Sequence, residues 1–110
     1  MAHMPDTCVF CDVIAGKLPR TLIFEDTDTI VIKDIHPQAP VHLLVIPKAH
    51  IADFTALSSS EIATSMKVVG QMIHDHGIKN YRIVNNGGGA ELIRHVHIHI
   101  IGSIDKHRNL

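Results

Sequence analysis

The chain has 110 residues, enough for one domain with one hydrophobic core and too few for two. Apolar residues make up 45% of the chain and charged residues 19%, which is typical of a folded protein and excludes a disordered one. The formal net charge of -1 gives no general attraction to nucleic acid or an anionic membrane, and no apolar run approaches the ~20 residues that span a bilayer. With no secretory signal at the N-terminus, we expect a cytoplasmic protein.

Histidine is the unusual residue type, because the ten histidines equal all lysines and arginines together. The two cysteines, Cys8 and Cys11, are separated by two residues. In a reducing compartment this spacing indicates half of a metal site or a redox pair, since a disulfide there would close a very short loop. Met1–Met4 contains two methionines, and Met4 is a candidate start, so these four residues are left out of the fold prediction.

The first part of the chain predicts a short helix and a hairpin. An apolar stretch over residues 8–15 is followed by Gly16, which predicts one or two helical turns with glycine as the stop. The β-rich runs at residues 22–25 and 29–33 are joined by turn-forming residues, so they predict two paired strands.

A loop and a third strand follow the hairpin. Residues 35–40 contain two prolines and predict a loop. Residues 41–46 predict a strand that is stopped by Pro47.

The one long helix begins at a capping box, with Ser58 as the N-cap and Glu61 as the third helical residue. His74 and His76 fall in its last turn, where the helix dipole favours them, and Gly77 is the expected C′ residue. Apolar residues at steps of four, three and four predict the buried stripe: Ile62, Met66, Val69 and Ile73.

Two more strands complete the pattern. Residues 81–84 predict the first, residues 85–89 predict a tight glycine-rich loop, and residues 95–101 predict the second. Strands in a run with one substantial helix predict a single α+β domain over residues 1–110, with an antiparallel sheet of about five strands.

The last predicted strand reads His-Val-His-Ile-His-Ile-Ile over residues 95–101. Because successive side chains of a strand point to opposite faces, His95, His97 and His99 share one face, each ~6.6 Å from the next. Three imidazoles along one straight strand are a poor cage for a single metal ion, whose bonds to imidazole are ~2.0–2.1 Å long. We therefore expect divided roles: one for structure, one as nucleophile or base, and one as acid.

This pattern resembles the signature of the histidine triad (HIT) superfamily of nucleotide hydrolases and transferases. Three further blocks resemble its Hint-like branch, in the same order: Cys8–Cys11, residues 34–51 and residues 81–87. The resemblance runs from about Cys8 to Gly102. It implies a HIT-like fold and a symmetric homodimer with a continuous sheet.

The resemblance also implies a reaction, the hydrolysis of purine nucleoside 5′-phosphoramidates or related adenylyl compounds at the α-phosphorus. It makes His97 the nucleophile that forms a covalent nucleotidyl-histidine, His99 the residue that handles charge and protons, and His42 their support. A dinucleoside polyphosphate hydrolase and a zinc- or nucleotide-binding regulatory module with little turnover remain as alternatives.

The binding residues follow from the same resemblance. Asp34 would read the ribose hydroxyls, although from the residues alone it could be a turn former, and Asn85 would contact the phosphate region. The base would lie between Val9, Phe10, Leu18 and Ile35. A structural zinc ion would be held by Cys8, Cys11, His50 and His95, which suit a closed tetrahedral site.

Two segments depart from the family pattern. The usual Gly-Gln-x-Val before the triad is replaced by residues 90–94, in which Glu91 adds a carboxylate and Leu92 cannot form a hydrogen bond through its side chain. Residues 103–110 lack the Trp-Pro-Pro segment that shapes specificity in many Hint-like proteins. The leaving group is therefore left open. We expect a purine nucleotide as ligand, and neither nucleic acid nor a membrane as partner.

Overall fold

The structure, a computed structural model, describes residues 8–105. Its elements are α1 (Val9–Ile14), β1 (Leu22–Glu25), β2 (Thr29–Lys33), β3 (Val41–Pro47), the 3-10 helix η1 (Phe54–Ala56), α2 (Ser59–Asp75), β4 (Arg82–Val84) and β5 (Ile98–Gly102). The strands form one five-stranded sheet in the order β1-β2-β3-β5-β4, and every neighbouring pair is antiparallel. The predicted α+β class is confirmed. Met1–Met4 lie outside the described residues.

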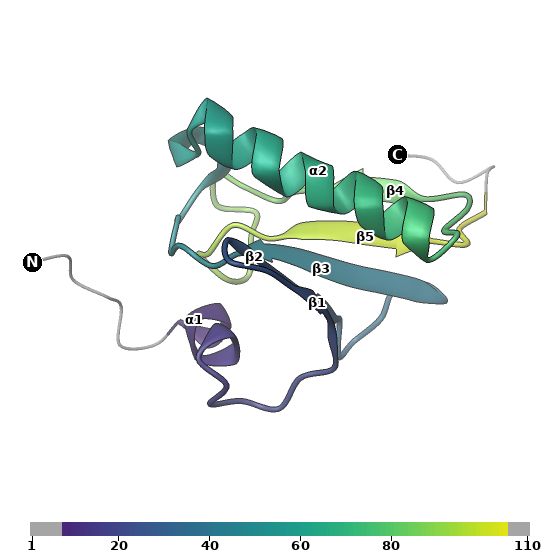
Figure 1. The fold of residues 1–110 in the computed structure, drawn as a ribbon, viewed down its shortest axis with the longest axis horizontal. Helices are drawn as coiled ribbons and strands as arrows, with labels where there is room; N and C mark the ends of the chain where they lie inside the picture. The colour runs from purple at the N-terminus through teal and green to yellow at the C-terminus, as the bar shows by residue number, and fades with distance from the viewer. Residues whose placement is uncertain (1–7, 106–110) are drawn as a thin grey trace, which may run out of the picture.

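The two helices pack on opposite faces of the sheet (Figure 1). The face under α2 is formed by Val31, Leu43, Val45, Ile98 and Ile100, which pack on Val68, Val69, Met72 and Ile78. The other face places Ile30, Ile32, Leu44 and Ile46 against Cys8, Phe10 and Val13. Because β2 and β3 are covered on both faces, their sequences are continuous apolar runs rather than alternating ones.

The capping box of α2 is present as predicted. The Glu61 backbone N–H donates to Ser58 Oγ at 3.1 Å, and the Ser58 N–H donates to Glu61 Oε1 at 2.8 Å. At the other end Gly77 follows the C-cap with a φ of 57°, a left-handed conformation that suits glycine.

The predicted buried stripe of α2 is partly wrong. Met66 is 39% exposed, whereas the buried residues of the helix are Ser65, Val68, Val69 and Met72. The predicted row and the observed row are neighbours on the helix surface. Periodicity therefore identified an apolar side of the helix without showing which row lies over the sheet.

The last strand is shorter than predicted, since β5 begins at Ile98 and not at residue 95. Continuing the register of β3 and β5 would place Val96 opposite Pro47, which has no N–H to donate. The Val96 N–H instead donates to the Ile51 carbonyl at 2.7 Å. The first two histidines of the triad therefore lie just before the strand.

Gly102 is predicted to be intolerant of any side chain. A Cβ there would lie 2.5 Å from Ile78 Cγ2 and 3.1 Å from Val41 Cβ. Gly102→Ala should lower the free energy of unfolding by ~1–3 kcal/mol, because the core must shift to admit a methyl group. Gly70→Ala, in the middle of α2 with nothing within 4 Å, should raise it by ~0.5–1 kcal/mol. Urea denaturation of both variants checks this, and equal stability of the two would contradict it.

Among the described residues, no helix combines the length and apolar character that a membrane crossing requires.

Candidate active site and metal centre

The predicted nucleotide-site residues meet in one cavity of about 670 Å³, within the range of small-molecule sites. The predicted residues that line it are Val9, Phe10, Leu18, Asp34, Ile35, His42, His97 and His99. Asn85 is used differently, since its Nδ2 donates to the His97 carbonyl at 3.0 Å while its neighbour Asn86 lines the cavity.

Further polar residues line the cavity that the sequence did not single out, among them Arg20, Lys33 and Gln38. The Arg20 side chain is held in place, because its Nη1 donates to the Val13 carbonyl at 2.6 Å. Two cationic side chains that line the same cavity as the histidines suit an anionic ligand. Neither belongs to a recognisable motif, so only the folded structure shows that Arg20, between α1 and β1, and Lys33, at the end of β2, line the cavity.

His97 is buried, 6% exposed, and its ring is fixed from both sides. Its Nδ1 lies 2.8 Å from the His95 carbonyl, and a carbonyl only accepts, so Nδ1 carries the proton and donates. The ring packs edge-on against Phe10 with centroids 4.8 Å apart. The other ring nitrogen, Nε2, is therefore left with a free lone pair, as a nucleophile requires.

His99 lies next to His97, with ring centroids 5.1 Å apart. Its Nδ1 is 2.8 Å from His42 Nε2, which is also 3.3 Å from Asp34 Oδ2. The other carboxylate oxygen of Asp34 accepts the His36 N–H at 2.8 Å. The structure thus brings three of the predicted residues, Asp34, His42 and His99, into one cluster, in which the two histidines are hydrogen-bonded and Asp34 lies against His42.

Burial lowers the pKa of His99 to about 4, and the nearby His97 and His42 rings add to the effect against the opposing charge of Asp34. A lowered histidine pKa means that below about pH 6.5 the unfolded chain binds a proton that the folded chain does not. The free energy of unfolding should therefore fall as the pH is lowered from about 6.5 to about 4. The same change of pH should lower it by less in His99→Gln. NMR titration of the His99 ring should give a midpoint near 4; a midpoint at or above 6.5 would contradict the pKa assignment.

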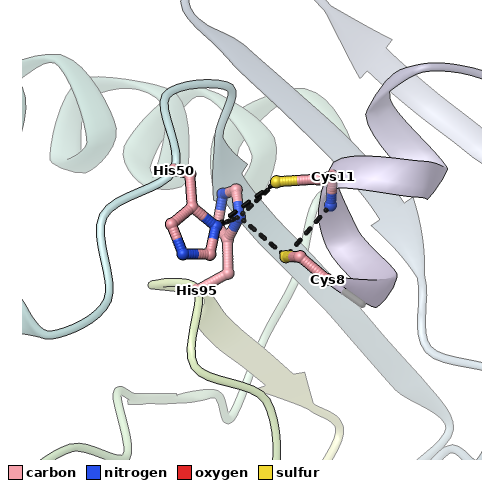
Figure 2. A group of neighbouring side chains, drawn as sticks. All are labelled: Cys8, Cys11, His50 and His95. Carbon is pink, nitrogen blue, oxygen red and sulfur yellow. Dashed lines mark hydrogen bonds between the residues drawn. The ribbon is translucent and has the colours of Figure 1, made fainter. Parts of the chain in front are cut away.

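A second cluster lies at the N-terminal end of α1, where Cys8, Cys11, His50 and His95 converge (Figure 2). Their four ligand atoms all lie within 4.8 Å of one another. The His95 Nδ1 lies 3.5 Å from Cys8 Sγ, 3.6 Å from Cys11 Sγ and 3.2 Å from His50 Nδ1, and Cys11 Sγ lies 3.3 Å from His50 Nδ1.

The tautomer of His95 fits a metal ligand. Its Nε2 lies 2.7 Å from the Pro47 carbonyl, so Nε2 carries the proton and Nδ1 turns a lone pair toward both sulfurs. Two sulfur and two nitrogen donors are a donor set that zinc takes in closed structural sites. The cluster is compatible with zinc, and the two cysteines are free.

The glycine loop before the triad is held by hydrogen bonds to Asp53 and to Glu91. The Gly88 N–H donates to Asp53 Oδ1 at 2.9 Å, and the Gly89 N–H donates to Glu91 Oε1 at 2.7 Å. The Glu91 carboxylate is therefore engaged by its own loop. Leu92 lines the cavity and is 99% exposed, so its apolar side chain lies at the rim of the cavity.

Residues 7–109 match the family model described as scavenger mRNA decapping enzyme C-term binding. A HIT-like protein of Chlamydia muridarum is 42% identical over 102 residues, which cover 87% of this chain and 81% of that protein. The chain belongs to the histidine triad superfamily.

Solved structures of other HIT proteins agree with this assignment. A HIT family hydrolase from Legionella pneumophila superposes with a TM-score of 0.83 at 35% identity, covering 90% of this chain and 95% of that one. A zinc-bound histidine triad family protein from Mycobacterium smegmatis gives a TM-score of 0.78 at 31% identity, covering 91% of this chain and 77% of that one.

Proposed function

We propose that this HIT protein is a nucleotide hydrolase. It acts at the α-phosphorus of purine nucleoside 5′-phosphoramidates or related adenylyl compounds and forms a covalent nucleotidyl-histidine. The observation that carries the proposal is the protonation state of His97, whose Nδ1–H is held by the His95 carbonyl while the opposite nitrogen is free. The hydrolase named among its structural relatives supports the reaction class.

The reaction takes two displacements. His97 Nε2 attacks the α-phosphorus, a P–N bond to His97 forms, and the P–N bond to the leaving amine breaks. The leaving amine nitrogen takes its proton from a water molecule on the His99 side of the cavity, where the His99 N–H can donate a hydrogen bond. The hydroxide that remains attacks the same phosphorus, the bond to His97 breaks, and the nucleoside monophosphate is released. Dividing one displacement into two lowers each barrier.

The rest of the cavity suits the nucleoside. Phe10, Val9, Leu18 and Ile35 provide an apolar slot for the base, and three of them are exposed to solvent enough to receive a ligand: Val9 at 46%, Leu18 at 39% and Ile35 at 79%. The Asp34 carboxylate has acceptor capacity beyond its contacts with His36 and His42, so it can accept from ribose hydroxyls.

We further propose that Cys8, Cys11, His50 and His95 hold one zinc ion. A closed tetrahedral site supplies structure rather than chemistry, since no position remains for water. The four residues come from three separate parts of the chain, so the site would fasten α1, which carries the base slot, to the segment that carries His97.

We also propose a cytoplasmic homodimer with a continuous sheet. Support comes from β4, which is an edge strand of the sheet and has exposed apolar side chains on and beside it, with Tyr81 47% and Ile83 43% exposed. An edge strand with exposed apolar side chains favours pairing with a second copy. Sedimentation velocity at micromolar concentration should give the mass of a dimer, and a monomer at all concentrations would exclude this arrangement.

Asp34→Asn is expected to weaken binding of adenosine monophosphate by ~10–100-fold, because hydrogen bonds to a charged acceptor contribute ~1.5–3 kcal/mol. Its preference for the ribonucleotide over the 2′-deoxy analogue should narrow. Isothermal titration calorimetry with both nucleotides measures this, with the exposed turn residue Asp28 changed to Asn as the matched control. Unchanged discrimination between the sugars would show that Asp34 does not read ribose.

Turnover assays decide between the proposed reaction and its alternatives. With an adenosine 5′-phosphoramidate the products should be adenosine monophosphate and the amine. If the protein releases two nucleotides from a dinucleoside polyphosphate faster than it hydrolyses the phosphoramidate, the alternative reaction, dinucleoside polyphosphate hydrolysis, is favoured. Tight nucleotide binding without turnover of either substrate would indicate a regulatory module.

A further inference from the structure

The protonation state of His42 is fixed by the loop before β3. The backbone N–H of Gln38 points at His42 Nδ1 from 3.0 Å. A backbone N–H can only donate, so His42 Nδ1 must accept, and the ring carries its proton on Nε2. A proton on both nitrogens would set two N–H groups against each other at this contact.

The surroundings of His42 Nε2 agree with this protonation state. The two atoms near it are Asp34 Oδ2 at 3.3 Å and His99 Nδ1 at 2.8 Å. Asp34 Oδ2 is a carboxylate oxygen and accepts. The short contact to His99 is then a hydrogen bond from His42 Nε2–H to His99 Nδ1. A neutral His99 whose Nδ1 accepts must carry its own proton on Nε2.

We propose that the main-chain N–H of Gln38, acting through His42, sets the tautomer of His99 so that His99 presents an N–H to the substrate. Gln38 and His42 are positioning residues in this chain of hydrogen bonds, and His99 is the group that touches the substrate. The inference about the substrate rests on the proposed function. The tautomer itself does not.

The result is that two neighbouring histidines have opposite tautomers. His97 is protonated on Nδ1 and offers a lone pair, whereas His99 is protonated on Nε2 and offers a donor. A donor beside the nucleophile can bond a phosphoryl oxygen or the leaving nitrogen. The reverse tautomer would turn a lone pair toward these electron-rich atoms and lose that hydrogen bond. Since the pKa of His99 is lowered to about 4, the ring is neutral near pH 7 and its tautomer decides its role.

The loop that carries the Gln38 N–H is built to hold it in place. Pro37 and Pro40 fix two backbone φ angles on either side of it. The His36 N–H donates to Asp34 Oδ1 at 2.8 Å, and Gln38 Nε2 donates to the His36 carbonyl at 3.2 Å. The donor is therefore oriented before substrate arrives.

The same protonation pattern argues against a metal ion at Asp34, His42 and His99, although their ligand atoms also lie within 4.8 Å of one another. A metal would need a lone pair on His42 Nε2. That nitrogen carries the proton as long as the Gln38 N–H occupies Nδ1.

Histidine NMR tests the proposal directly. Two-bond ¹H–¹⁵N correlations distinguish protonated from unprotonated ring nitrogens. In the wild-type protein at pH 7, His42 and His99 should carry protons on Nε2 and His97 on Nδ1. A proton on His99 Nδ1 would overturn the proposal, and it would do so whether or not the protein hydrolyses phosphoramidates.

Variants then isolate the Gln38 N–H. Gln38→Pro deletes the backbone N–H, whereas Gln38→Ala removes the side chain and keeps the backbone N–H. We expect a mixture of His99 tautomers in Gln38→Pro and the single Nε2–H tautomer in Gln38→Ala. The kcat of Gln38→Pro should be at least ~10-fold below that of Gln38→Ala, the loss of about one hydrogen bond. Equal His99 tautomers and equal kcat in the two variants would refute the proposal.

A second pair serves if Gln38→Pro does not fold. His42→Gln keeps an N–H₂ donor for His99 Nδ1, whereas His42→Leu has none. The Nε2–H tautomer should persist in His42→Gln and be lost in His42→Leu, with partial recovery of kcat in the former. If His99 keeps the Nε2–H tautomer in both variants, His42 does not set that tautomer.

Discussion

His97→Ala should lower kcat by at least ~10⁴-fold, because removal of a covalent nucleophile abolishes the two-step route. His99→Ala should lower it by ~10²–10⁴-fold, the usual contribution of proton transfer or a hydrogen-bond donor in the transition state. His97 has the free Nε2 and His99 has the free N–H, so the two losses should differ in size and in kind.

Binding of adenosine monophosphate should survive in His97→Ala, since Asp34 and the base slot are unchanged. Steady-state kinetics and titration calorimetry give the two quantities separately. His74→Ala is the matched control, because the His74 side chain is 90% exposed and is not among the residues lining the cavity. Near wild-type turnover in His97→Ala would refute the assignment of the nucleophile.

Cys8→Ser should lose the metal and at least ~4 kcal/mol of stability. A ligand that binds only the folded state, at a free concentration 1,000 times its Kd, stabilises that state by about this amount. Cys8 lies at the N-cap of α1, where its Sγ accepts the Cys11 N–H at 3.3 Å, and it contacts His95 across 87 residues of sequence. Losing the zinc would therefore release α1 from the segment that leads to His97.

The measurements are metal content and thermal unfolding. Protein purified without chelator should contain about one zinc per chain. At roughly 4–8 °C per kcal/mol, Cys8→Ser or wild-type protein treated with a chelator should unfold at least ~16 °C earlier. His74→Ala should keep both the zinc and the unfolding temperature. A metal-free wild-type protein of equal stability would exclude a structural role for zinc.

Local signals predicted the fold well wherever one short segment decides the outcome. The capping box of Ser58 and Glu61 and the left-handed Gly77 are set by residues a few positions apart, so the sequence contains all that is needed. The hairpin of β1 and β2 is another such case. These features depend little on distant contacts.

Features that depend on distant contacts were predicted less well. Contacts with the sheet decide which row of α2 is buried, and Pro47, which is 51 residues before Ile98, decides where β5 begins. The family resemblance named His42 as support. It could not reveal the hydrogen bond from Gln38, because a backbone N–H has no sequence signature and its direction depends on the loop.

The central claim is that His97 carries the nucleotide during turnover. Enzyme mixed with an adenosine 5′-phosphoramidate, quenched rapidly with acid-free denaturant and digested with trypsin, should yield the peptide between Arg94 and Lys106, which contains three histidines. Fragmentation of this peptide in a mass spectrometer assigns any added nucleotide to one of them. We predict adenylate on His97 alone. Adenylate on His99, or none on the peptide while substrate is being hydrolysed, would contradict the account.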